Sequence, residues 1–271
     1  MKLRMAKHWK FFSLTLSWSW ILWGICIVFG FSISNGIGMI CYILGAVAPS
    51  SVGIILARLE KDRNYWDSFF RRLIDFKRIQ SRWYLIIFGL IPAVIVGSVL
   101  TNYLVSGNIP SFTVLGNYLK SPVSLVGFAL ATLIGGPLFE ELGWRGYGLD
   151  QLRERYNLIW SGLIVTFFWV IWHLPLFMVA GTLQSALLDE SFISFLSYNV
   201  EIFSYGILVV WIYNNNSKSI LSAILFHFSI NFFAGITSLP TGVKHFETII
   251  QLIIAISILI YWKNSDSTTI N

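Results

Sequence analysis

Three short polar motifs interrupt apolar stretches of this sequence. They are Glu140-Glu141-x-x-x-Arg145, His173 and His227-x-x-x-Asn231. Carboxylates and imidazoles exchange protons with water and substrates, and a carboxamide beside an imidazole can donate hydrogen bonds to a developing oxyanion. The motifs therefore contain the groups needed for acid–base catalysis, provided that the fold brings them together.

The spacing within the first motif separates its two carboxylates. On a helix Glu141 and Arg145 are four residues apart and share a face, so we expect them to form an ion pair. Glu140 lies about 100° further round the helix and faces elsewhere. A carboxylate without an ionic partner is available as a general base. We therefore expect Glu140 to be a candidate general base, and Glu141 and Arg145 to form a salt bridge that caps the end of the helix.

The two histidine motifs differ in how strongly they indicate a functional site. A lone histidine such as His173 is more often a hydrogen-bonded packing residue, and Pro175 would kink its helix just beyond it. His227 and Asn231 share one helix face in a run of Phe, Ile and Leu. That pair could hold an oxyanion, His227 could bind a metal, or both could link helices by hydrogen bonds.

The elements that must position these motifs are membrane helices. The chain is 56% hydrophobic and only 12% charged, whereas soluble domains carry about 25% charge. Eight apolar segments are each near the ~20 residues that cross a bilayer. We expect an all-α polytopic bundle, a single domain over 1–271, with spans at 12–33, 36–56, 83–104, 122–145, 158–180, 192–213, 219–237 and a short last one at 247–262.

The positive charges are distributed unevenly between the two sides of this predicted bundle. If both termini are cytosolic, 17 of the 19 Lys and Arg residues fall on the cytosolic side, and only Lys120 and Lys244 lie opposite. The net charge of +6 thus indicates an anionic inner leaflet as partner and no nucleic acid. The basic, aromatic stretch 58–82 is typical of a helix lying on that leaflet. Glu201, near the outer face, has no evident partner or role.

The three motifs, in this order on separate spans, resemble those of the CAAX prenyl endopeptidases of the Ras-converting type and their prokaryotic relatives, the CAAX-processing or Abi family. An aromatic residue four positions before His173, here Trp169, belongs to the same pattern. The motif core covers about 122–237, and the eight-span layout extends the similarity to nearly the whole chain. An archaeal homologue is especially similar.

This resemblance implies a role for each residue. Glu140 would activate a water that His173 helps to hold, and His227 and Asn231 would bind the oxyanion, with Glu141 and Arg145 in support. The substrate would be a prenylated CAAX protein or peptide, cleaved after the prenylated cysteine to release the last three residues. The resemblance also implies a multi-pass membrane protein, in the cell membrane of a prokaryote or the endoplasmic reticulum of a eukaryote, with its active site open to the cytosol.

Several alternatives stay open. Zinc could be held by Glu140, His173 and His227, although the absence of HExxH favours a metal-free site in which Glu140 activates the water. A protease of the same family could act on unprenylated membrane peptides. From other classes, a transporter could use the buried acids, or His173 and His227 could ligate a haem.

Overall fold

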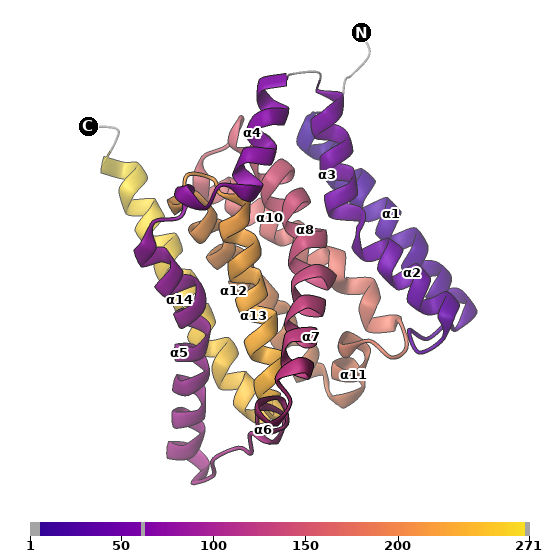
Figure 1. Ribbon diagram of the computed structural model, residues 1–271, viewed down its shortest axis with the longest axis vertical. Coiled ribbons are helices and arrows are strands. Elements are labelled where there is room, and N and C mark those ends of the chain that lie inside the picture. The colour runs from indigo at the N-terminus through magenta and orange to yellow at the C-terminus, as the bar shows by residue number, and fades with distance from the viewer. Residues whose placement is uncertain (1–5, 61–62, 269–271) are drawn as a thin grey trace.

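The computed structural model describes residues 6–60 and 63–268, and within these ranges the chain is helical without a strand. Figure 1 shows the helices packed side by side as one bundle. The α-helices are α1 (Lys7–Phe29), α2 (Gly36–Ala46), α3 (Ala48–Leu59), α4 (Arg63–Ile74), α5 (Ser81–Ser106), α6 (Thr113–Lys120), α7 (Pro122–Leu133), α8 (Phe139–Gly143), α9 (Asp150–Arg153), α10 (Leu158–His173), α11 (Leu183–Glu190), α12 (Phe192–Asn215), α13 (Ile220–Thr237) and α14 (Thr241–Thr268). Short 3₁₀ turns follow at η1 (Phe76–Arg78) and η4 (Leu174–Met178), and π-turns at η2 (Ile134–Leu138) and η3 (Trp144–Leu149).

The predicted membrane bundle is confirmed. In the described part of the chain, 7 helical stretches are long and apolar enough to cross a bilayer, and α2 with α3, bent by 41°, would make 8. Because of this bend, the predicted span 36–56 consists of two helices and not of one straight helix. The last span, predicted as short, is instead the 28-residue helix α14.

The stretch that carries the two glutamates is one continuous span, Pro122–Arg153, built from α7, η2, α8, η3 and α9. Pro137 lies inside η2, where its missing N–H and its ring are incompatible with regular α-helical hydrogen bonding. The span packs closely on α3, because a Cβ at Gly143 would clash with the Pro49 carbonyl oxygen. This contact fixes α8, and with it the two glutamates, in the middle of the bundle.

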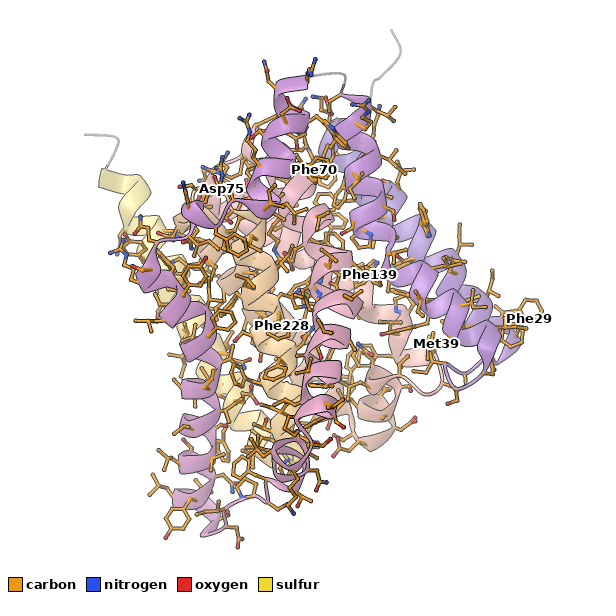
Figure 2. All side chains as sticks on the ribbon, in the orientation of Figure 1. Phe29, Met39, Phe70, Asp75, Phe139 and Phe228 are labelled. Atoms are coloured by element: carbon orange, nitrogen blue, oxygen red, sulfur yellow. The ribbon has the colours of Figure 1, made fainter. Side chains whose placement is uncertain are left out.

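The two ends of the bundle differ in what they carry. We call the end that holds the start of α1, α4 and the connections 154–157 and 216–219 the terminal face. The opposite end, with the connections 30–35, 107–112, 179–182 and 238–240, is the distal face. Figure 1 shows α4 and the last turns of α14 toward the upper end of the bundle, with α6 and α11 away from them. Figure 2 likewise shows Phe70 and Asp75 toward this end, and Phe29 and Met39 far from both.

Within the predicted basic stretch, α4 is a helix anchored to the bundle by a buried arginine. Arg72 contacts Asp150 Oδ2 at 2.7 Å and donates to the Tyr213 hydroxyl at 2.6 Å. Burial alone lowers the pKa of Arg72, but Tyr213 and Asp150 outweigh it and raise that pKa overall, so the guanidinium stays charged. The structure thus ties α4 to α9 and α12. That α4 lies on a lipid leaflet stays a prediction.

Candidate active site

One cavity of about 570 Å³ contains all four side chains to which the sequence assigned chemistry. Glu140 reaches it from α8, His173 from the end of α10, and His227 and Asn231 from α13. Glu140, His173 and His227 are 8%, 7% and 4% exposed, so all three polar groups are removed from lipid and bulk water. The three motifs, which are separate in the sequence, therefore contribute side chains to the same cavity.

Gly136 is the point at which three of these side chains approach one another. A Cβ built on Gly136 would lie 2.9 Å from Asn231 Nδ2, 3.8 Å from Glu140 Oε1 and 3.9 Å from His227 Nε2. The missing side chain leaves a space about the size of a small group between these three polar atoms. A peptide carbonyl or a water molecule in this space would contact all of them.

Glu140 makes no ion pair among the described residues, as its position on the helix suggested. Its Oε2 accepts a hydrogen bond from the Trp169 indole nitrogen at 2.6 Å. Its other oxygen, Oε1, is the one beside Gly136. The indole therefore fixes the carboxylate while one oxygen stays available to a ligand, which suits a base.

Glu141 forms the expected pair with Arg145 and also a contact that the sequence did not reveal. Its Oε1 accepts from Arg145 Nη1 at 2.9 Å and from His227 Nδ1 at 2.8 Å. Glu141 and Arg145 are both 0% exposed, and the Arg145 guanidinium stacks over Trp169 at 4.7 Å. The pair thus orients the His227 ring and the Trp169 indole, and its own atoms lie outside the cavity lining.

His173 is held by its own helix. Its Nδ1 lies 2.7 Å from the Trp169 carbonyl oxygen, which can only accept, so Nδ1 carries the hydrogen. In the neutral ring Nε2 then has a free lone pair. Pro175 was expected to kink this helix; instead the α-helix ends just before it, where α10 gives way to the 3₁₀ turn η4 at Leu174.

A second polar wall of the cavity was missed at the level of sequence. It is formed by α11, α12 and the start of α14 and consists of Gln184, Ser197, Tyr198, Glu201, Lys244 and His245. Gln184 donates to the Tyr198 hydroxyl at 2.6 Å, and Ser197 Oγ lies 2.9 Å from His245 Nδ1. Glu201, for which no partner was expected, lines this wall, as does Tyr205 one turn further along α12. The signal in the sequence was the cluster of polar residues at the start of two spans, which reads equally well as an ordinary membrane boundary.

The lining of the cavity extends to the distal face. It includes Ile33, Thr182 and Ser238 from the distal connections, and no residue of 154–157 or 216–219. The basic segments lie on the terminal face, at the opposite end of the bundle. That both termini are cytosolic and that the active site opens to the cytosol stay predictions.

Metal binding by this site is not supported by the arrangement of its side chains. Over residues 6–60 and 63–268, no group of three or more His, Cys, Asp and Glu side chains has a metal-binding arrangement, and this includes Glu140, His173 and His227. Both ring contacts use Nδ1, so Nε2 of each histidine stays available to a ligand. That the site works without a metal stays a prediction.

A membrane bundle that encloses a carboxylate, two imidazoles and a carboxamide in a buried cavity has the features of an intramembrane hydrolase. The family model of the type II CAAX prenyl endopeptidase Rce1-like proteins matches residues 122–233, which span α7 to α13. A curated relative, CAAX prenyl protease 2 of Methanococcus maripaludis, is 33% identical over 258 residues, covering 93% of each chain.

The chain therefore belongs to the Rce1-like type II CAAX prenyl endopeptidase family, and it is a multi-pass membrane endopeptidase of the CAAX protease type. This agrees with the resemblance seen in the motifs. It also sets aside the transporter and haem alternatives, because both described a non-enzymatic bundle.

Proposed function

We propose that this protein hydrolyses the peptide bond after a prenylated cysteine in C-terminal CAAX sequences, using a water activated by Glu140. One observation carries the proposal: Glu140, Asn231 and His227 present polar atoms to the same small space beside Gly136, inside a cavity that His173 also lines. The family and the name of the archaeal relative support the substrate class.

The hydrogen-bonding pattern suits a single nucleophilic water. Glu140 Oε1 and the lone pair on His173 Nε2 are both acceptors, and a water molecule has two hydrogens to donate. A water held this way turns a lone pair toward the substrate carbonyl. As the oxygen attacks, Glu140 takes one of its protons.

His227 and Asn231 are suited to the oxyanion. The Asn231 amide is a donor in any state. His227 already donates its Nδ1 hydrogen to Glu141, so it donates at Nε2 only when doubly protonated, with its charge beside the Glu141 carboxylate. When the C–N bond breaks, the proton on Glu140 passes to the leaving nitrogen. The products are the prenyl-cysteine carboxylate and a free tripeptide.

The two walls of the cavity suit the two parts of this substrate. One wall is apolar and includes Trp23, Ile33, Ala46 and Phe128, contributed by α1, α2, α7 and the loop after α1. A prenyl chain is stabilised by such a surface through removal from water, at about 25 cal/mol per Å². The polar wall on α12 and α14 suits the peptide. The lipid therefore contributes binding energy that an unprenylated peptide lacks.

The side from which the substrate enters indicates which face of the bundle lies in the cytosol. A prenylated C-terminus is presented from the cytosol, so we propose that the distal face, to which the cavity lining extends, is cytosolic. The distribution of Lys and Arg favours the reverse, with the terminal face against an anionic inner leaflet. Labelling of single cysteines placed on either face separates the two orientations.

The decisive experiment uses the purified full-length protein and two peptides that differ only in prenylation, with products read by mass. We expect the tripeptide to be released from the prenylated peptide, and release to survive exhaustive chelation. Equal cleavage of both peptides would mean that the enzyme acts on membrane peptides in general. Activity that is lost on chelation and restored by zinc would contradict the metal-free mechanism.

A further inference from the structure

The cavity contains a single fixed cation whose position the catalytic mechanism does not explain. Among the described lining residues, Lys244 is the only Lys or Arg. It lies in the first turns of α14, next to His245, and faces the cavity from the polar wall. A lysine inside a membrane span is costly and calls for a partner, so its place in the cavity needs an explanation.

Nearby acids do not neutralise this lysine through a direct ion pair. Glu201 and Glu247 are the acidic side chains close enough to Lys244 to interact with it electrostatically. Glu247 Oε1 accepts from Gln251 at 3.1 Å and from Tyr205 at 3.3 Å. Over the described residues no carboxylate lies within the 4.0 Å ion-pair limit of Lys244. The ammonium thus keeps donors for a ligand that enters the cavity.

The position of Lys244 relative to the catalytic groups sets the direction of a bound peptide. The apolar wall lies on α1, α2 and α7, the catalytic side chains come from α8, α10 and α13, and Lys244 lies on α14. Three residues beyond the cleaved bond extend roughly 10 Å in an extended chain. With the lipid on the apolar wall, the released tripeptide points toward the polar wall and ends in its own carboxylate.

We propose that Lys244 binds the C-terminal carboxylate of the substrate, with His245 beside it, and so measures the length of chain after the cleaved bond. The inference rests on the proposed function and deepens it. An ammonium–carboxylate contact is charge-assisted, and in a buried setting it discriminates strongly against a neutral end group. Lys244 would then be a specificity residue that does not touch the reacting atoms.

The test uses prenylated CAAX peptides that end either in the free acid or in a C-terminal amide. For the wild-type protein we expect kcat/KM to be about 10- to 100-fold higher on the acid. Lys244→Met should lower kcat/KM on the acid by a similar factor, mostly through KM, because the contact is made equally in ground and transition states. The two peptides should then be cleaved at similar rates. Lys244→Arg should restore most of the preference.

Lys120→Met is the matched control, because Lys120 lies on α6 outside the cavity lining and is the other lysine expected on this side of the membrane. It should keep the preference for the acid. Equal cleavage of acid and amide by the wild-type protein, or an equal loss on both peptides in Lys244→Met, would overturn the carboxylate site and leave the protease intact. Release of tripeptide from neither peptide by the wild-type protein would overturn the proposed function and this inference with it.

Discussion

Glu141 and His227 lie 86 residues apart in the chain, on different helices, yet Oε1 of Glu141 lies 2.8 Å from Nδ1 of His227. The same oxygen accepts a hydrogen bond from Arg145 at 2.9 Å. The ion pair expected within one helix is therefore extended to a second helix, where it orients a cavity-lining ring. Glu140 and Glu141 are neighbours in the sequence, but they have different partners. Glu140 accepts a hydrogen bond from Trp169, whereas Glu141 accepts from Arg145 and His227.

Glu141→Gln should mainly affect stability. The amide keeps the shape but loses the charge, leaving the buried Arg145 without its partner, and breaking a buried pair costs about 3 kcal/mol or more. We expect a lower unfolding temperature in detergent and a smaller loss of cleavage than in Glu140→Gln. Unchanged stability with complete loss of cleavage would show instead that Glu141 takes part in the chemistry.

Asn231→Ala should lower kcat by about 10²- to 10³-fold, the usual effect of removing one oxyanion donor. KM should change little, because the contact strengthens only as the oxyanion forms. Asn215→Ala, at the end of α12 and outside the cavity lining, is the control and should retain wild-type rates. A loss below about fivefold would argue against an oxyanion role for Asn231.

Gly136→Ala should block the space between the catalytic atoms. Its Cβ would lie 2.9 Å from Asn231 Nδ2, so either the carboxamide moves or the ligand is displaced, and we expect kcat/KM to fall at least about tenfold. Gly127→Ala is the matched control, because a Cβ there has no atom within 4 Å and Gly127 lies on α7 outside the cavity lining. Thermal unfolding of both variants separates a loss of activity from a loss of fold. Similar activity of both variants would contradict the proposed position of the reacting carbonyl.

The orientation prediction is tested with single cysteines in a background where Cys26 and Cys41 are replaced by serine. Asn108→Cys reports the distal face and Arg155→Cys the terminal face, and both positions are exposed. If the distal face is cytosolic, a membrane-impermeant maleimide added to intact cells should label only Arg155→Cys. Labelling of Asn108→Cys alone would place both termini in the cytosol and exclude cytosolic entry at the distal face.

The sequence predicted the helical spans and the site residues because both depend on local patterns. Apolar runs define spans, and the spacing of Glu141 and Arg145 defines a pair on one helix. The contact of Glu141 with His227 depends on how α8 packs on α13, through Gly143 against α3, and no local pattern specifies it. The polar wall with Lys244 was missed for the same reason, since a cavity is space that several helices leave together.

The most direct test of the account is the rate of tripeptide release by Glu140→Gln on a prenylated CAAX peptide, under single-turnover conditions and with folding checked by thermal unfolding. If Glu140 takes the proton from the attacking water, the rate should fall by about 10²- to 10⁴-fold while the peptide still binds. Release within about threefold of the wild-type rate by a folded Glu140→Gln protein would contradict the mechanism.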